Sequence, residues 1–320
     1  MLNVLAITGP IYIAIAVGFA AVRFELFSKA DMHVLGKFVI DIALPALLFR
    51  ALATHRIAEI LNPTYMLAYA LGSLAVIGAS RFVSRRLAHL DAQTSTFIAM
   101  GMSCSNSGFV GYPILLLTLA PVAGVVLALN MVVENIVVIP LLLALAEHGR
   151  GGAAAGPWHS VVRHTLRRLA KNPLILAIVA GLAVSLFDWT PPEPVDRAIQ
   201  MFALASGAAS LFVIGGTLVG LSVGSVWRRV LPIAAGKLLL HPLAVLLAVL
   251  AVPLLGLPPL HATLRTAAVL SAAMPMFGIY PILAQAYGHE HFAAPALLVT
   301  TAAAFFSLSG ILWALGRFHW

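Results

Sequence analysis

Four side chains that could bind or carry charge lie inside long apolar stretches of the sequence. Asp41 falls in the run FVIDIALP, Glu134 and Asn135 fall in MVVENIVV, and Lys237 falls in AAGKLLLH. An ionisable group inside an apolar segment of membrane length is costly to bury, so each is a candidate functional residue. A carboxylate beside an amide can hold Na⁺ or shuttle a proton, because oxygen ligands suit hard cations. We predict that Asp41, Glu134 and Asn135 are coupling-ion candidates and that Lys237 is a charge partner.

Each of these residues also has a structural interpretation. Asp41 could pair with a base of the scaffold, and Glu134 with Asn135 could form a hydrogen-bonded clamp between helices. Lys237 could attract a substrate carboxylate, or it could counterbalance Asp41 or Glu134. Alternatively, its apolar stem could extend toward the cytoplasmic interface. His241 lies one turn after Lys237 on the same helix face.

Two other segments resemble each other and carry helix-breaking residues. They are SNSGFVGYPILL, which starts at Ser105, and AMPMFGIYPILA, which ends at Ala284. Each stands in the fourth apolar stretch of its half of the chain, which predicts an internal repeat. The identical aligned residues are Phe109, Tyr112, Pro113, Ile114 and Leu115 in the first segment and Phe277, Tyr280, Pro281, Ile282 and Leu283 in the second.

These two segments are predicted to interrupt their helices. Proline removes a helical hydrogen bond and clashes with the preceding turn. Interruptions at mid-membrane expose N–H and C=O groups, which are tolerated only against protein or a wet cavity. The N-terminal ends of the half-helices then attract an anion. The alternative is two kinked structural helices, since Pro and Gly are common in membrane helices. We predict substrate-binding residues at Ser105, Asn106, Ser107, Gly108, Pro113, Pro275, Tyr280, Pro281 and Gln285.

The elements that must position these residues are membrane helices. Hydrophobic residues make up 61% of the 320-residue chain and charged residues only 9%, whereas soluble domains carry about 25% charged residues. The formal charge of +8 could indicate a nucleic-acid partner, but the basic residues lie in breaks between apolar stretches rather than on one face. The expected environment is therefore the lipid bilayer, with no nucleic acid.

The spacing of apolar stretches predicts ten membrane spans, since a bilayer core takes roughly 20 residues per helix. A polar stretch at 147–171 separates five spans from five. An odd number per half makes the second copy enter from the opposite face, so the repeats are inverted. The predicted organisation is a first repeat at 1–146, a cytoplasmic loop at 147–171 and a second repeat at 172–320. The expected spans are Asn3–Val22, His33–Ala53, Pro63–Ser84, Thr94–Leu119, Val122–Ala146, Asn172–Phe187, Val195–Leu221, Trp227–Leu254, His261–Tyr287 and His291–Gly316.

The distribution of basic residues predicts the orientation. Of the 19 Lys and Arg residues, thirteen fall in the odd-numbered connections and five on the opposite side. Basic residues are enriched in cytoplasmic connections. Both termini are therefore expected outside, with the 147–171 loop in the cytoplasm.

Several segments together resemble the auxin efflux carrier family over essentially the whole chain. They are IALPALLF, SNSGFVGYP, NPLILAIVAGL and MPMFGIYPILAQAYG, and the run LNMVVENIVVIPLLLALAEHG is most similar to the bacterial malonate transporter-like branch. The resemblance implies a ten-helix fold of the bile-acid-symporter type, with helices four and nine crossing as broken helices. It also implies alternating access by a transport domain moving against a scaffold domain, and it allows a homodimer.

The same resemblance implies small organic anions, carboxylates in particular, as substrates. It places Asn106 and the Pro113/Pro281 pair at the crossing. One departure is Met274, which stands where the first copy has Asn106, so the site would be asymmetric. Coupling differs among members of the family, so Na⁺, H⁺ and uncoupled transport all stay open.

The expected function is thus a secondary transporter, not an enzyme, in the bacterial inner membrane. It would move a mono- or dicarboxylate such as malonate or malate. A passive uniporter or efflux carrier of another small solute is the alternative. An intramembrane enzyme is disfavoured. The candidate nucleophiles are Ser103, Ser105 and Ser107, and His241 is the only histidine in the middle of a predicted span that could act as their base. The run GMSCS also does not match the G-x-S-x-G motif of a nucleophile elbow. No phosphate-binding loop or metal-ligand cluster is apparent, so no cofactor beyond a coupling Na⁺ or H⁺ is expected.

Overall fold

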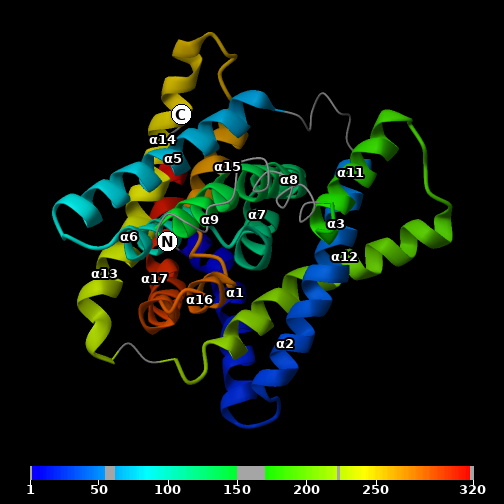
Figure 1. Ribbon diagram of the computed structural model, residues 1–320. Coiled ribbons are helices and arrows are strands. Elements are labelled where there is room, and N and C mark those ends of the chain that lie inside the picture. Colours follow the sequence, from blue (N-terminus) through cyan, green and yellow to red (C-terminus); the bar gives the residue numbers. More distant parts are fainter. Residues whose placement is uncertain (1, 55–61, 150–169, 222–223, 318–320) are drawn as a thin grey trace. The chain divides into compact units, whose positions relative to one another are not determined.

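The computed structural model describes residues 2–54, 62–149, 170–221 and 224–317, and most of these residues are helical (Figure 1). Among them, extended pairing is limited to an isolated antiparallel bridge between Ser105 and Met276. The predicted all-helical fold is therefore confirmed for this part of the chain. Most of the predicted 147–171 loop lies outside the described residues.

Six helical stretches are long and apolar enough to cross a membrane, and two shorter apolar helices accompany them. Five of them each coincide with one predicted span, and Ser107–His148 runs through parts of two, which supports a multi-pass membrane protein. The count of ten spans and the inversion of the two halves remain predictions. The six long stretches are Lys29–Ala53, Pro63–Arg86, Ser107–His148, Glu193–Thr217, Trp227–Leu255 and Glu290–Ala314, and the shorter ones are Gly9–Arg23 and Pro173–Leu186.

The chain forms two compact units whose segments alternate along the sequence. The first unit comprises Met1–Pro63, Ser107–Met131 and Ala170–Gly220, and the second comprises Thr64–Asn106, Val132–Leu169 and Leu221–Trp320. Each unit therefore draws on both halves of the chain, whereas the predicted repeats divide the chain in sequence order.

The helices of each unit are as follows. The first unit contains α1 (Leu2–Arg23), α2 (Lys29–Phe38), η1 (Val39–Ala43), α3 (Leu44–Ala53), η2 (Ser107–Gly111), α7 (Tyr112–Leu119), η3 (Ala120–Val122), most of α8 (Ala123–Val133), α11 (Pro173–Leu186) and α12 (Glu193–Thr217). The second contains α5 (Pro63–Arg86), α6 (Ala92–Ser103), η4 (Glu134–Val138), α9 (Ile139–His148), η5 (Gly224–Val226), α13 (Trp227–Ala235), η6 (Gly236–Leu240), α14 (His241–Ala251), η7 (Val252–Leu255), α15 (Ala262–Ala273), α16 (Tyr280–Gln285) and α17 (Glu290–Arg317).

In the first unit, α1 packs along α12 with backbones in direct contact. A Cβ at Gly18 would lie 2.0 Å from the carbonyl oxygen of Phe212, and a Cβ at Gly215 would lie 1.9 Å from that of Ile15. Small residues at a membrane helix crossing allow this close approach, and dispersion contacts then hold the pair. Glycine is therefore required at both positions.

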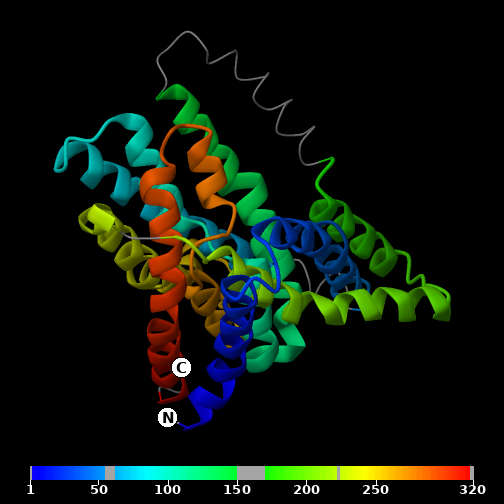
Figure 2. The ribbon, with the colours of Figure 1, turned by 90° about the horizontal axis from the view of Figure 1, so that it is seen from below.

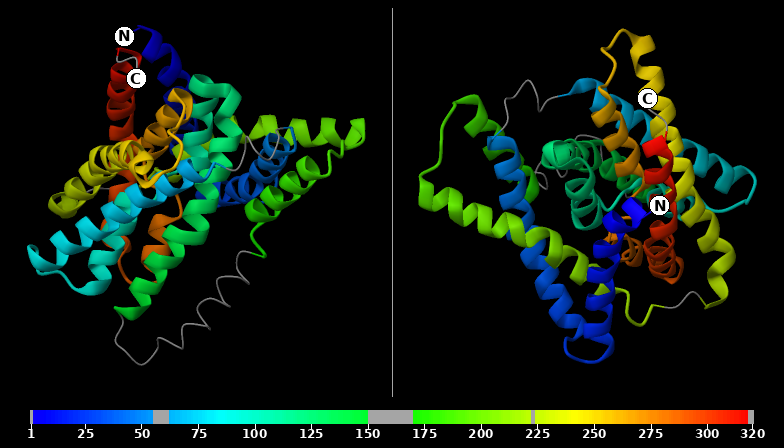
Figure 3. Two further views of the ribbon diagram at one scale, coloured as in Figure 1. Left: turned by 90° about the horizontal axis from the view of Figure 1, so that it is seen from above. Right: turned by 180° about the vertical axis from the view of Figure 1, so that it is seen from behind.

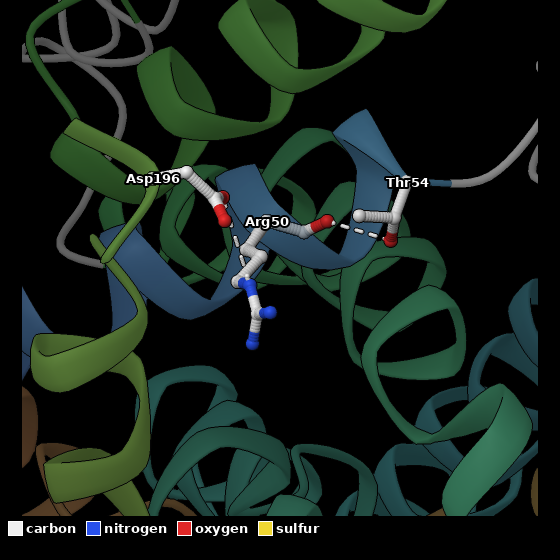
Figure 4. A network of polar contacts seen from close by, with 3 residues as sticks. All are labelled: Arg50, Thr54 and Asp196. Atoms are coloured by element: carbon white, nitrogen blue, oxygen red, sulfur yellow. Dashed lines mark hydrogen bonds and ion pairs between the residues drawn. The ribbon is translucent and has the colours of Figure 1, made fainter. Parts of the chain in front are cut away.

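Also in the first unit, α3 packs against α11 and α12. Arg50 of α3 and Asp196 of α12 form a partly exposed ion pair, with 3.8 Å between Nε and Oδ1 (Figure 4). Thr54 donates from Oγ1 to the Arg50 carbonyl over 2.9 Å and so closes the end of α3. An exposed pair of this kind contributes about 0–1 kcal/mol, so apolar packing dominates this contact.

In the second unit, the long helix α17 packs on α13, α15 and α16. Figures 2 and 3 show it as one continuous rod, coloured orange to red. By contrast, α15 and α16 are short pieces of one predicted span. Gly72 of α5 lies against Val245 of α14, where an added Cβ would come within 2.7 Å of the Val245 Cα.

Both predicted helix interruptions are present. The helix α6 ends at Ser103, Cys104 is extended with φ −97° and ψ 125°, and η2 begins at Ser107. The helix α15 ends at Ala273, Met274 is extended with ψ 152°, and α16 begins at Tyr280. The prediction that these two spans are broken is confirmed.

The two prolines of the repeat occupy different positions relative to the helix breaks. Pro281 is the second residue of α16 and lies in the first turn after its break, whereas Pro113 follows η2 inside the helical stretch that begins at Ser107. A proline in the first helical turn loses nothing, because its missing N–H would have no helical partner there.

Each candidate charged residue lies in a π-helical segment that precedes a proline. Asp41 is in η1 before Pro45, Glu134 is in η4 before Pro140, and Lys237 is in η6 before Pro242. A proline clashes with the carbonyl four residues earlier, and a local i→i+5 widening relieves that clash. Such π-bulges often occur at functional sites.

Candidate functional site

A chain of buried polar side chains lies beside the two helix breaks within the second unit, and Lys237 is at its centre. Lys237 is 0% exposed, and its Nζ donates to the Ser105 hydroxyl at 2.9 Å and to the Ala272 carbonyl at 2.6 Å. Its Nζ is also 2.9 Å from Nδ1 of His241. An ammonium has three donors, so these partners use its full capacity. The interfacial interpretation of Lys237 is therefore wrong, because its head group is enclosed by acceptors.

The Glu134 carboxylate connects to the same centre through Ser105. Its Oε1 accepts from the Ser105 backbone N–H at 3.2 Å and from the Tyr69 hydroxyl at 3.1 Å. The Tyr69 hydroxyl is also 3.2 Å from Ser105 Oγ. Glu134 is 4% exposed. Ser105 thus contacts the buried anion through its N–H and the buried cation through its hydroxyl.

His241 extends the chain on the other side of Lys237. Because the ammonium donates to Nδ1, that nitrogen must accept, and the proton of a neutral imidazole must lie on Nε2. Nε2 is 3.0 Å from the Ser73 hydroxyl, which is then the acceptor. With Lys237 as an ammonium, this hydrogen-bond pattern therefore requires a neutral His241.

The two breaks pair with each other through their backbones. The Asn106 N–H donates to the Pro275 carbonyl over 2.8 Å, and Ser105 bridges to Met276 in antiparallel fashion. These bonds satisfy groups that the interrupted helices leave without helical partners. The asymmetric site predicted from Met274 stays a prediction; Asn106 and Met274 are both buried in their breaks.

The predicted binding residues of the second break differ in exposure. Tyr280 is fully buried, and its hydroxyl donates to the Phe97 carbonyl over 3.0 Å, so it ties α16 to α6. Pro275 is buried, Pro281 is half-buried, and Gln285 is exposed at the end of α16. Of these four, Pro275 lies nearest to the backbone pairing of the breaks.

The predicted binding residues after the first break belong to the first unit. Ser107, Gly108 and Pro113 are buried there. A Cβ at Gly108 would lie 3.0 Å from Cδ1 of Leu44, so this glycine permits close packing of η2 near α3. The Phe109 carbonyl in η2 accepts from the Ser210 hydroxyl over 2.9 Å.

The coupling-ion candidates separate into two groups. Glu134 is part of the buried chain described above, and its neighbour Asn135 is half-buried. Asp41 belongs to the first unit and is exposed. Asp41 and Glu134 were the two carboxylates predicted as alternative counter-charges for Lys237, and Glu134 is the one that belongs to this polar chain.

Tyr69 and Ser73 were not predicted from the sequence. Both lie on α5, and with Tyr65 they form a polar series at four-residue spacing within YMLAYALGS. Residues four apart share one helix face, so this series was the available signal.

Comparisons with known proteins identify the family of the chain. The family described as "Membrane transport protein" matches residues 8–312. The chain is 28% identical to the "Putative malonate transporter" of Rhizobium meliloti (strain 1021), over 98% of this chain and 96% of that protein. It is also 28% identical to the "Uncharacterized transporter YfdV" of Escherichia coli (strain K12), over 74% of this chain and 76% of that protein. The match covers nearly all of the broken-helix fold, and the chain belongs to the membrane transport protein family of auxin efflux carriers.

Proposed function

We propose that the protein is a secondary transporter that moves a small organic anion across the bacterial inner membrane by alternating access. A mono- or dicarboxylate such as malonate or malate is the proposed substrate. The observation that carries the proposal is the pair of broken helices, whose breaks are hydrogen-bonded to each other beside the buried side chains of Lys237 and Glu134.

The chemistry of the first break favours an anion. A helix that starts inside the membrane presents N–H groups without helical acceptors and carries a partial positive charge. The stretch that begins with Ser107 and continues into α7 is such a start, with Ser107 as its first residue and Asn106 directly before it. Broken helices in transporters commonly direct these N-terminal ends at carboxylates.

The division into two compact units supports a mechanism with moving parts. Each unit is assembled from segments of both halves of the chain, as two domains built from inverted repeats would be. We propose ten spans in two inverted five-helix repeats, with both termini outside. The match of the malonate transporter-named relative over 98% of this chain supports a dicarboxylate as the first substrate to test.

Binding can be tested with purified protein in detergent. The Tm would be measured across a panel of mono- and dicarboxylates for the wild type, for Asn106→Ala and for Gln200→Ala. Gln200 is a half-buried amide on α12, away from both breaks in sequence, and serves as the matched control. A bound ligand raises Tm by mass action.

The proposal expects at least one carboxylate to raise the Tm of the wild type and of Gln200→Ala, but not that of Asn106→Ala. Equal shifts in all three proteins would place the anion site elsewhere. If no carboxylate shifted the wild type, the substrate class would be wrong. Chemical conversion of the ligand during incubation would favour an enzyme over a transporter.

A further inference from the structure

The C-terminal ends of two half-helices lie next to the Lys237 ammonium. Lys237 donates to the carbonyl of Ala272 in the last turn of α15 and to the hydroxyl of Ser105, two residues past the end of α6. Helix C-termini carry partial negative charge and carbonyls without helical partners. In broken-helix carriers such ends are where coupling cations bind. In this protein the Lys237 side chain lies at the C-terminal ends of α6 and α15.

The charges within this group balance without an added ion. Glu134 is a buried carboxylate, and Lys237 is joined to it through Ser105. A buried charge is tolerated only when it is compensated. When Lys237 is an ammonium, it donates to Nδ1 of His241, 2.9 Å away, and the imidazole is then neutral. One negative and one positive group therefore sum to zero.

The ligands that a metal cation would need are also occupied. Na⁺ requires oxygen atoms, and the Ala272 carbonyl and the Ser105 hydroxyl already accept from Lys237 at 2.6 and 2.9 Å. A second cation at this place would lie within a few ångströms of the ammonium, in a low-dielectric interior where like charges repel strongly. Lys237 and Na⁺ are therefore mutually exclusive.

We propose that the Lys237 ammonium is the built-in cation of this carrier and takes the place of a coupling Na⁺, so anion binding and transport need no Na⁺. This inference rests on the proposed transport function, but its cation site can be tested on its own. Removing the ammonium should convert the centre into a Na⁺ site, because the acceptor oxygens and the Glu134 charge would remain.

The test measures the Tm of purified protein while Na⁺ replaces K⁺ or choline at constant ionic strength, with no substrate present. The variants are Lys237→Ala, which removes the ammonium, and Lys237→Met/Glu134→Gln, which removes both charges. Lys29→Ala is the matched control, because Lys29 is exposed and lies in the first unit. Anion-induced Tm shifts of the wild type would be measured in the same three salts.

The wild type, Lys29→Ala and the double variant should be indifferent to Na⁺, whereas Lys237→Ala should show a saturable rise in Tm with Na⁺ alone. A specific Na⁺ response of the wild type would overturn the proposal, as would a folded Lys237→Ala that ignores Na⁺. A Na⁺ response of the double variant would also contradict it, since the acidic ligand is gone. If Lys237→Ala folds only when prepared in Na⁺, that result supports the proposal, and failure to fold in every salt leaves the wild-type arm decisive.

Failure of the transport proposal gives a different pattern. If only Lys237→Ala responds to Na⁺ but no carboxylate shifts the wild-type Tm, the proposal that Lys237 replaces a coupling Na⁺ is supported and the proposed substrate class is wrong. If a carboxylate shifts the wild type only when Na⁺ is present, the transport proposal stands and the built-in cation is refuted.

Discussion

Replacing Lys237 with methionine removes a charge that three acceptors surround, while keeping a side chain of similar length. The Glu134 carboxylate would then be buried without its compensating cation, and the Ala272 carbonyl and Ser105 hydroxyl would lose a donor. Removing one partner of a buried pair typically costs about 3–5 kcal/mol of the free energy of unfolding. The reverse substitution, Glu134→Gln, leaves the Lys237 ammonium buried without its counter-charge and should lower the free energy of unfolding by a similar amount.

The double variant Lys237→Met/Glu134→Gln has no stranded charge. Replacing a buried pair by neutral groups of similar volume is often neutral or even stabilising. We therefore expect the double variant to be more stable than either single variant, although simple addition of the single effects would predict a loss of about 6–10 kcal/mol.

The assay is a double-mutant cycle on the free energy of unfolding, measured by SDS titration in mixed micelles. Glu193→Gln and Arg197→Met form the control cycle, because both side chains of this i,i+4 pair are 74% exposed. Exposed helical pairs contribute about 0.3–0.5 kcal/mol, so that cycle should be close to additive. Additivity of the Lys237 and Glu134 substitutions within about 0.5 kcal/mol would refute the charge-balance reasoning.

Three other substitutions test separate parts of the fold. Gly18→Val should force α1 and α12 apart and lower Tm strongly, since overpacking typically costs about 1–3 kcal/mol or more, whereas Gly78→Val in open space should not. Asp91→Ala removes the N-cap of α6 and should cost about 1 kcal/mol of stability. Partial burial raises the pKa of Asp91, but hydrogen bonds from the first turn of α6 outweigh burial and lower that pKa. The stabilisation by the cap is therefore present above the unfolded-state pKa and is lost as the pH falls through the folded-state pKa. Tyr280→Phe removes the side-chain donor to the Phe97 carbonyl, which keeps its place in helix α6, and should cost about 0.5–1.5 kcal/mol of stability while preserving anion-induced Tm shifts. Loss of those shifts in a folded variant would instead assign the hydroxyl to the binding site.

The helix breaks could be predicted because their cause is local. Polar residues, glycines and prolines cluster in SNSGFVGYP and MPMFGIYP, and these residue types disfavour a regular helix. The first break lies at 104–106, before the helical stretch that contains Pro113. The sequence did not show that Pro281 would lie in the first turn of a new helix, or that the breaks would pair as Asn106 with Pro275. Pairing depends on two segments that are far apart in the chain.

The polar chain was predictable only in part. Lys237 and Glu134 stand out in apolar runs, but Tyr69 and Ser73 are ordinary residues of a membrane helix until the fold brings them to Glu134 and His241. Similarly, the two compact units do not follow the order of the repeats, because helices associate by their packing faces and not by their position in the chain.

Uptake of labelled malonate into proteoliposomes, with wild type and Asn106→Ala reconstituted side by side and Gln200→Ala as control, tests the central claim most directly. We predict saturable uptake by the wild type and Gln200→Ala that unlabelled dicarboxylates inhibit, that proceeds equally in Na⁺ and in K⁺, and that Asn106→Ala lacks. If wild-type vesicles take up malonate and other small carboxylates no faster than protein-free vesicles, the protein is not the organic-anion carrier proposed here.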